Sequence, residues 1–432
     1  MTVTAWLRRQ RLSTEGRDLV GPCTTFLDEM TRALQGRPSS LPMIPTYIEI
    51  ARAVPRGEKV IALDAGGTNL RVALVSFDDK GAPVVEGLSR HGMPGVDAAI
   101  SKDEFFRALA AFVLPYAGKA SRIGFCFSYP AEILPQKDGR LIHFTKEIKA
   151  QGVDGQLIGA GLAEALSAAG APGAPRIVLI NDTVTTLLAG RNARPGRTFD
   201  SFVGVVCGTG FNVAYVESNA LLMKTPGLDP SGMQVVNTES GSYGRDRAGA
   251  VDDGFDATTI NPGRYRHEKT ISGAYLGALC LHAVRQAARD GVLGQGAVSA
   301  LQDIGALSTR ELNEYLLDPD GVGSPLGNAA ARLPSPAAAS LYTVCDAVVE
   351  RAAAHVAVNL AAVVLKTGRG RDPRYPVCIT VDGTTFWQLR AFRSRVESFL
   401  RRMLSGSRTR AWEITGVEDA PLLGAAIAAL TN

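Results

Sequence analysis

Polar side chains suited to binding a polyol and a phosphoryl group follow several apolar runs of the sequence. Asp64 follows the run Val60–Leu63, and Asp182 follows the run Ile177–Ile180 after a single asparagine. The ends of three predicted strands carry Ser128, Thr145, Lys146, Asn181 and Asp182. Taken singly, each is most simply a polar residue that ends a strand. Because ligands of α/β proteins gather at strand ends, three such ends within one stretch of chain favour a polar pocket.

The types of these residues point to transfer of a phosphoryl group to a sugar. Sugar hydroxyls both donate and accept hydrogen bonds, so carboxylates and amides bind them in pairs. Phosphoryl transfer needs positioning and charge neutralisation more than covalent chemistry. Asp182 is therefore the candidate general base for the attacking hydroxyl. Asp64 is the candidate partner of magnesium through a water molecule, and Lys146 could complement charge near the transferred group.

Two stretches of the chain have the order strand, glycine turn, strand. Gly66-Gly67-Thr68-Asn69 joins two apolar runs within 59–77, and Gly208-Thr209-Gly210 joins two more within 202–217. Glycine lets the backbone approach a ligand, and successive free N–H groups make an anion-binding nest. Either stretch alone could be an ordinary hairpin. Their recurrence favours two phosphate-binding hairpins that each begin a domain and hold a nucleotide between them.

Other nucleotide and hydrolase motifs are missing from the sequence. It has no G-x-x-x-x-G-K-[ST] loop, no G-x-G-x-x-G after the first predicted strand and no G-x-S-x-G elbow. A P-loop enzyme, a dinucleotide fold and an α/β-hydrolase are therefore disfavoured.

Helices and strands are expected around these residues. Apolar spacing predicts helices over 16–36, 102–117, 154–169, 270–290, 338–366 and 386–404, with a small-residue helix at the C-terminus. Strands are expected over 122–130, 141–146, 176–183 and 377–385. The segment 182–200 is expected to act as a hinge. Helices of the first 55 residues and the final helix are expected to pack across both lobes.

Length and composition narrow the class of protein. With 432 residues, the chain is too long for one ordinary core, so two domains are expected. Its net charge of +4 points neither to nucleic acid nor to an anionic membrane. The closest two of the six cysteines, Cys345 and Cys378, are 33 positions apart, which excludes a local zinc pair and fits a reducing compartment. No apolar leader is seen at the N-terminus, so no signal peptide is expected. The apolar segment 347–365 contains charged residues, so it is expected to be a buried helix and not a membrane span.

Several segments, in the family's order, resemble the hexokinase family of the actin-like sugar kinases. Residues 63–71, 208–212 and 381–384 are similar to its two phosphate motifs and its adenosine-side turn. Residues 124–130 with 141–146 resemble its sugar-binding signature, 180–183 its catalytic aspartate segment, and 237–244 and 261–277 two further sugar-site segments. The resemblance runs from about residue 25 to the end.

The resemblance implies roles for individual residues. The catalytic residues would be Asp182, as base, and Lys146. The sugar would be bound by Ser128, Thr145, Lys146, Asn181, Asp182, Asn212, Glu239 and Glu268. The nucleotide would be bound by Asp64, Gly66, Gly67, Thr68, Asn69, Arg71, Gly208, Thr209, Gly210, Gly383 and Thr384. Two departures stand out: Ser240 replaces the family's tryptophan, and 417–424 lacks its Gly/Ser-rich turn near the adenine.

The expected fold is α/β, a two-lobed actin-like ATPase (ribonuclease H-like) fold with mixed sheets and an interlobe cleft. The small lobe would comprise 55–195 plus 417–432, and the large lobe 1–54 plus 196–416. The expected protein is a cytoplasmic, single-unit hexokinase that uses ATP and magnesium to phosphorylate the 6-hydroxyl of glucose. Its small-molecule partner would be a hexose, and no binding to nucleic acid or to a membrane is expected. The protein would be a monomer or a homodimer.

Three alternatives remain at this point. The first is an ATPase of the same fold that holds a protein partner. It is disfavoured because such an ATPase would not need the polyol-binding residues. A catalytically weak sugar sensor is disfavoured by the intact set of Asp64, Asp182 and Thr209. A zinc-containing glucokinase of the same superfamily would need closely spaced cysteines.

Overall fold

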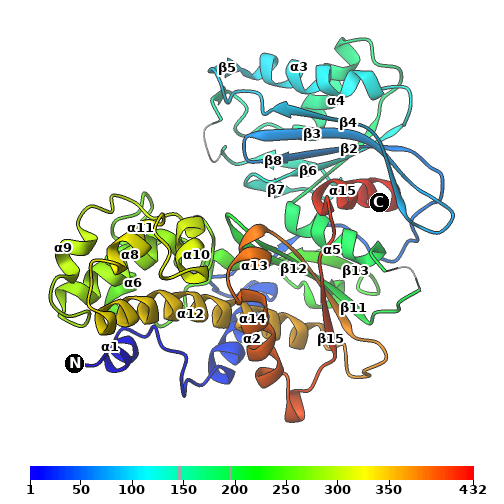
Figure 1. Cartoon of the computed structure of the whole chain (residues 1–432). Coiled ribbons are helices and arrows are strands. Elements are labelled where there is room, and N and C mark those ends of the chain that lie inside the picture. Colours follow the sequence, from blue (N-terminus) through cyan, green and yellow to red (C-terminus); the bar gives the residue numbers. More distant parts are fainter. Residues whose placement is uncertain (145–147, 195) are drawn as a thin grey trace.

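The fold is described from a computed structural model of the chain, which covers residues 1–144, 148–194 and 196–432. Two large mixed sheets form the centres of two lobes (Figure 1). The first contains β2 (Val60–Gly66), β3 (Asn69–Phe77), β4 (Pro83–Gly92), β6 (Arg122–Phe127) and β10 (Arg176–Ile180). The second contains β1 (Ile44–Pro45), β11 (Ser201–Cys207), β12 (Phe211–Ser218), β13 (Met233–Asn237), β14 (Val377–Asp382) and β15 (Trp412–Thr415). Two short pairs, β5 (Ile100–Ser101) with β9 (Ala150–Gln151) and β7 (Ala131–Ile133) with β8 (Gly139–Leu141), lie apart from them.

The two sheets repeat one topology. The first has the order β4-β3-β2-β6-β10, and five strands of the second have the order β13-β12-β11-β14-β15. In each, three antiparallel strands are followed by two strands that pair in parallel. Each sheet therefore begins with one of the two glycine hairpins, as their recurrence in the sequence predicted.

Helices cover both sheets. Those of the first half are α1 (Val3–Arg9), α2 (Val20–Leu34), α3 (Lys102–Val113), α4 (Ile158–Ala168), α5 (Asp182–Asn192), α6 (Ala250–Asp256) and α7 (Arg266–Lys269). The remainder are α8 (Leu276–Arg289), α9 (Ala297–Leu301), α10 (Thr309–Leu317), α11 (Pro325–Ala330), α12 (Ser335–Thr367), α13 (Thr384–Gln388), α14 (Phe392–Met403) and α15 (Ala420–Thr431). One-turn 3-10 helices lie at Leu114–Tyr116, Asn219–Leu221, Ser240–Ser242 and Gly406–Arg408.

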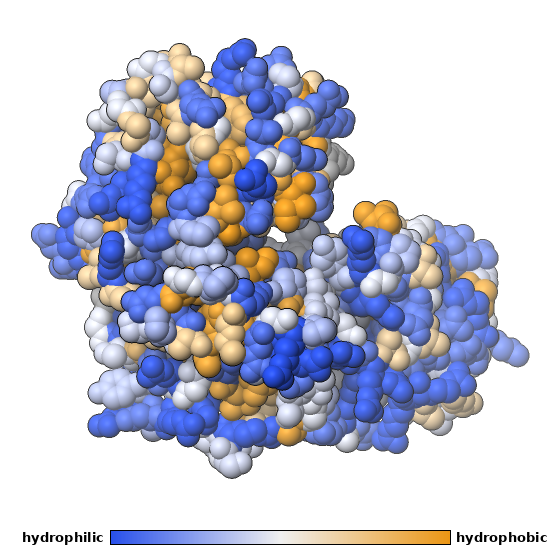
Figure 2. Space-filling view, turned by 180° about the vertical axis from the view of Figure 1, so that it is seen from behind, coloured by the Kyte–Doolittle hydropathy of each residue, from blue (hydrophilic) through white to orange (hydrophobic). Residues whose placement is uncertain are grey.

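Helices α5 and α15 lie between the two sheets (Figure 1). They share a core with Ala62 and Val75 of the first sheet and with Ala214 and Val216 of the second. The two helices cross so closely that a Cβ on Gly424 of α15 would lie 2.0 Å from the carbonyl oxygen of Thr185. The junction of the lobes is thus a packed core, and α5 occupies most of the segment predicted to be a hinge. The surface is hollowed between the lobes beside this junction (Figure 2).

Two further cores flank this junction. Helices α3 and α4 pack on the outer face of the first sheet. Helices α1, α2, α8, α12 and α14 belong to the core of the second lobe. The expectation that the N-terminal helices pack across both lobes is therefore wrong, because α1 and α2 pack against α12. Helix α12 is long and apolar enough to cross a membrane, but 89% of its most apolar stretch is buried inside the molecule.

Candidate active site

The first glycine hairpin is held by charged side chains and by hydrogen bonds to its turn. The Gly67 carbonyl accepts from the Tyr129 hydroxyl, and the Thr68 carbonyl accepts from the Met93 N–H at 2.9 Å. Residues Gly66 and Asn69 are its last paired residues, and Gly67 in the turn has φ +68°. The Arg71 Nε and Nη2 atoms donate to Asp64 Oδ2 at 2.9 and 2.7 Å, and its Nη1 atom donates to Asp419. Arg71, predicted to bind the nucleotide, thus joins Asp64 to the start of α15. Thr68 and Asn69 are exposed at the tip of the turn.

The predicted base, Asp182, is the first residue of α5. The preceding Asn181 caps this helix, because its Oδ1 atom accepts from the Thr183 N–H at 2.8 Å. Burial raises the pKa of Asp182 and the charge of Asp64 adds to that rise, whereas hydrogen bonds from Ser128 and Thr183 oppose it. A raised pKa brings a carboxylate closer to the working range of a general base.

The second glycine hairpin is held by backbone contacts. The Gly208 carbonyl accepts from the Gly273 N–H at 2.8 Å and from the Thr385 hydroxyl at 2.9 Å, and the Thr209 carbonyl accepts from the Ala274 N–H at 3.1 Å. Gly383, between β14 and α13, has φ +119° and lies against this turn. A Cβ at Gly383 would lie 2.4 Å from the Cys207 carbonyl, so only glycine fits there. The neighbouring Thr384 is exposed.

Amides hold one predicted sugar carboxylate. The Glu239 Oε1 atom accepts from Asn212 Nδ2 at 2.9 Å and from Asn237 Nδ2 at 2.8 Å. Burial raises the pKa of Glu239, and the nearby charge of Asp182 raises it further. Glu239 also has φ +52°, a left-handed conformation that costs a non-glycine residue free energy of order 1–3 kcal/mol and that clusters at functional sites.

The second predicted sugar carboxylate, Glu268, lies between two glycines. A Cβ on Gly210 would lie 3.2 Å from Glu268 Oε1, and one on Gly241 would lie 2.9 Å from Oε2. Burial, followed by the charge of Glu239, raises the pKa of Glu268 to about 7. Both carboxylates therefore face the same region as Asp182.

Two acidic residues of this region were not predicted. Asp382 ends β14, and burial raises its pKa, with further rises from the charges of Asp182 and Asp64. Its position after an apolar strand and before a glycine turn repeats that of Asp64, so the sequence did contain a signal for it. Asp419 could not have been found from local sequence, because its partner Arg71 lies 348 positions away.

The structure brings most of the predicted residues together. Ser128, Asp182, Asn212, Glu239 and Glu268 form one polar region between the two glycine hairpins. Thr145 and Lys146 lie outside the described residues. The strand predicted over 141–146 ends at Leu141, where β8 ends, and residues 142–144 are not in a strand.

Comparisons with known proteins agree with this architecture. Two family models described as hexokinase match residues 8–192 and 202–431. Rice (Oryza sativa subsp. japonica) Hexokinase-5 is 31% identical, with 98% of this chain and 88% of the rice protein covered. Mouse Hexokinase-3 is 32% identical over 87% of this chain, but the chain spans only 42% of that longer protein.

Solved structures share the fold. A Schistosoma mansoni hexokinase complexed with glucose has a TM-score of 0.77 at 24% identity, covering 99% of this chain and 98% of that one. Another hexokinase crystal structure has a TM-score of 0.79 at 23% identity, with the same coverage. The two hexokinase family models together match nearly the whole sequence, which shows that the chain belongs to the hexokinase family.

Proposed function

We propose that this protein is an ATP-dependent hexose kinase. It transfers the γ-phosphoryl group of Mg-ATP to the 6-hydroxyl of glucose and related hexoses. The observation that carries this proposal is the position of Asp182, which lies at the start of α5 within one polar region with Ser128 and Glu239, between two glycine hairpins.

Asp182 acts as the general base. Its carboxylate accepts the proton of the 6-hydroxyl as the oxygen attacks the phosphoryl group, a contribution of about 10² to 10⁴ in rate. The hydroxyl of Ser128 and the first turn of α5 keep the carboxylate in place. Asn212, Glu239 and Glu268 bind the other sugar hydroxyls, and Thr145 and Lys146 belong to the same proposal on resemblance alone.

The acidic residues beside the first hairpin fit a magnesium ion. Asp64, Asp182 and Asp382 interact unfavourably with one another, and the positive charge of Arg71 opposes the rise in the pKa of Asp382. Oxygen ligands of this type suit Mg²⁺, which keeps several waters and binds through one or two carboxylates and the substrate phosphates. Asp64, through water, and Asp382 would hold the ion, which would neutralise charge on the phosphates.

Closure of the lobes excludes water from the site. Water is a competing nucleophile that would hydrolyse ATP, so a kinase gains from completing its site only when the sugar is bound. The proposed moving parts are a small lobe of 55–195 plus 417–432 and a large lobe of 1–54 plus 196–416. The hinge lies at the ends of α5 rather than within this buried helix.

The test is ADP release from ATP and Mg²⁺ with glucose, fructose, mannose and glucosamine. We expect a hexose to stimulate release, and Asp182→Asn to lower kcat by about 10² or more. Asp79→Asn, in the exposed turn after β3, is the matched control and should keep full activity. An absence of stimulation by every hexose would overturn the kinase proposal and favour a sugar sensor or a partner-binding ATPase. Full activity of Asp182→Asn would overturn only the assignment of the base.

We also propose a cytoplasmic location, since all six cysteines are free and buried, as expected in a reducing compartment. A monomer or homodimer is proposed on the family resemblance alone, and light scattering of the purified chain would measure it.

A further inference from the structure

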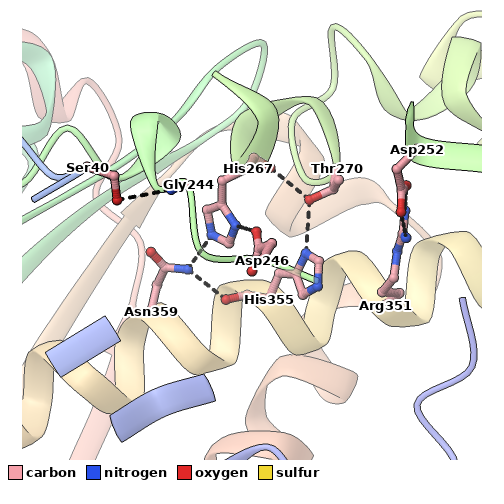
Figure 3. Close-up of polar contacts among 9 residues, drawn as sticks. All are labelled: Ser40, Gly244, Asp246, Asp252, His267, Thr270, Arg351, His355 and Asn359. Carbon is pink, nitrogen blue, oxygen red and sulfur yellow. Dashed lines mark hydrogen bonds and ion pairs between the residues drawn. The ribbon is translucent and has the colours of Figure 1, made fainter. Parts of the chain in front are cut away.

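A second cluster of ligating side chains lies in the large lobe, outside the proposed active site. It comprises Asp246, His267 and His355, whose nearest oxygen and nitrogen atoms all lie within 4.8 Å of one another (Figure 3). Asp246 comes from the loop before α6, His267 from α7 and His355 from α12. Three elements far apart in the sequence thus bring one carboxylate and two imidazoles to a single point.

The spacing of the two rings matches that of two imidazoles on one zinc ion. Zn–N bonds of 2.0–2.1 Å in a tetrahedral arrangement place the ring centres about 5.2 Å apart and the ligating atoms about 3.3 Å apart. The ring centres of His267 and His355 are 5.4 Å apart. The ring planes are inclined at 23°, and the ligating atoms, which lie within 4.8 Å of one another, must close to about 3.3 Å when an ion binds.

Burial and access also suit a metal ion. His267 is 1% exposed and His355 is 9% exposed, whereas the Asp246 side chain is 25% exposed. A cavity of about 60 Å³ borders Asp246, Thr270 and His355. It is large enough for a water molecule that would complete the coordination. Two buried cations line this cavity, and both are paired: Arg351 with Asp252 through two contacts of 2.8 Å, and Lys269 with Asp256 at 2.5 Å. The half-buried Arg17 also lies close enough to act on Asp246 and His355.

Neighbouring side chains fix both rings in place. His267 Nδ1 bonds Asp246, and His267 Nε2 accepts from Asn359 Nδ2 at 2.7 Å. His355 Nδ1 lies 2.9 Å from the hydroxyl of Thr270, which in turn donates to the His267 carbonyl at 2.8 Å. Such partners orient the imidazoles of metal sites. The loop that carries Asp246 is held too, since the Gly244 N–H donates to the Ser40 hydroxyl at 3.0 Å.

We propose that Asp246, His267 and His355 bind a divalent transition-metal ion, with Zn²⁺ the best fit. Imidazole and carboxylate suit Zn²⁺ and its neighbours in the first transition row, whereas Mg²⁺ and Ca²⁺ prefer all-oxygen sites. The ion replaces the proton between Asp246 and His267. That proton moves to Nε2 of the ring, where it needs an acceptor.

Asn359 supplies this acceptor. Its amide oxygen is buried and has no hydrogen-bond partner within the described part of the chain. When the amide turns, Oδ1 accepts from the Nε2–H of His267, and the amide gives up its 2.8 Å bond to the His355 carbonyl. The amide is therefore expected to turn only when an ion replaces the proton on Nδ1 of His267.

The ion would tie α7 and the loop before α6 to the long core helix α12. Glu268 follows His267 directly in α7, so the ion would also restrain a residue of the proposed sugar site. That consequence rests on the proposed function, whereas metal binding itself does not.

The test uses the full chain without an affinity tag, stripped with a chelator and titrated with Zn²⁺ by calorimetry. Titration with Co²⁺, followed by its visible absorption, reports the geometry. We expect one ion per chain, the intense Co²⁺ spectrum of a four-coordinate site, and no displacement by excess Mg²⁺. His267→Gln and His355→Gln should each weaken Zn²⁺ binding at least about 10-fold, and Asn359→Leu should weaken it less.

His91→Gln, in β4 of the other lobe, is the matched control and should bind as the parent chain does. Because replacing a buried histidine threatens the fold, Asp246→Asn, at the most exposed of the three residues, provides a variant of nearly unchanged shape. Circular dichroism checks that each chain is folded. The proposal is overturned if neither ion binds saturably. It is also overturned if folded Asp246→Asn and His267→Gln bind Zn²⁺ as tightly as the parent chain.

Discussion

The two glycine hairpins have the same place in their sheets, but only the first is joined to a distant helix by charged side chains. The guanidinium of Arg71 lies between Asp64 and Asp419, while the Gly67 carbonyl accepts from the Tyr129 hydroxyl and the Thr68 carbonyl from the Met93 N–H at 2.9 Å. The turn at Gly208–Gly210 is enclosed, and backbone groups of Gly273 and Ala274 and the hydroxyl of Thr385 bind its carbonyls. Hydrogen bonds to the turn carbonyls thus hold both hairpins, the first has an additional ion-pair link to the start of α15, and the second has close backbone contacts around Gly383.

This difference predicts which changes each hairpin tolerates. The first hairpin should be sensitive to the loss of its cation, Arg71, because that cation joins Asp64 to Asp419. A hairpin packed against other backbone withstands charge changes but not an added Cβ. One variant that removes the cation and another that adds a Cβ therefore measure separately what each interaction contributes to its hairpin.

The largest effect is expected for Gly383→Ala. Alanine there would adopt φ +119° and place its Cβ 2.4 Å from the Cys207 carbonyl. Strain and overpacking together should lower the free energy of unfolding by about 3 kcal/mol or more. Thermal unfolding followed by circular dichroism measures the loss, and ATP affinity should fall with it.

Gly66→Ala is the matched control on the first hairpin. A Cβ at Gly66 would meet only Asp64 Oδ1 at 3.8 Å, an ordinary contact, so the loss should stay below about 1 kcal/mol. An equal loss of stability in the two variants would contradict the close packing around Gly383.

Arg71→Met should break the charged hairpin. The side chains of Arg71 and Asp64 are 21% and 11% exposed, so the change leaves a largely buried carboxylate without its cation. We expect a loss of about 1–3 kcal/mol, below the range for a fully buried pair because solvent screens part of the interaction. Urea unfolding measures it.

A double-mutant cycle with Asp419→Asn isolates the link to α15. Asp419 is 36% exposed, so its single change should cost less than that of Arg71. A coupling energy of at least about 0.5 kcal/mol is expected for residues in direct contact. Strict additivity would mean that Arg71 does not connect the hairpin to α15.

The enclosed hairpin should also make sugar binding depend on pH through Glu268, which lies against Gly210. Its pKa is raised to about 7, so it is ionised at pH 8 and mostly protonated at pH 6. A carboxylate that accepts from sugar hydroxyls binds in its ionised form. The KM for glucose should therefore rise about tenfold from pH 8 to pH 6.

Glu268→Gln should remove this dependence while raising KM at pH 8, because the amide does not titrate. An unchanged slope in that variant would assign the titration to another group. Asp182 is distinguished by its effect, since protonation of the base lowers kcat rather than raising KM.

The sequence predicted the repeated hairpins because local glycines and apolar runs are sufficient to recognise them. It did not predict where α8 begins, since residues 270–275 are bound by tertiary contacts such as the Gly273 N–H to the Gly208 carbonyl. The hinge expected over 182–200 is mainly α5, which is buried between the sheets. Helix α5 is buried in part by α15, and no local sequence pattern predicts where α15 packs.

The candidate site shows the same limit. Asp182, Glu239 and Glu268 were identified from segments, whereas their mutual effects on pKa arise only when three elements meet. Asp382 could have been found by analogy with Asp64. The Arg71–Asp419 contact and the cluster of Asp246, His267 and His355 join distant segments, so a single sequence could not reveal them.

The smallest effect is expected for Ser240→Ala, behind the amides of the enclosed hairpin. Ser240 replaces the tryptophan of the hexokinase segment that residues 237–244 resemble, and a smaller side chain would leave looser packing. Yet it is 0% exposed, and its N–H donates to Asn212 Oδ1 at 3.3 Å. Its hydroxyl is buried without a partner among the described residues, which is costly.

Alanine removes that hydroxyl and keeps the backbone bond, so Ser240→Ala should raise the free energy of unfolding by up to about 1 kcal/mol. The KM for glucose should stay the same, because the amide of Asn212 still holds Glu239. Urea unfolding and a glucose titration measure the two quantities. A loss of stability above about 1 kcal/mol would show that the hydroxyl has a partner, such as an ordered water, and that the packing behind the sugar residues is polar rather than dry.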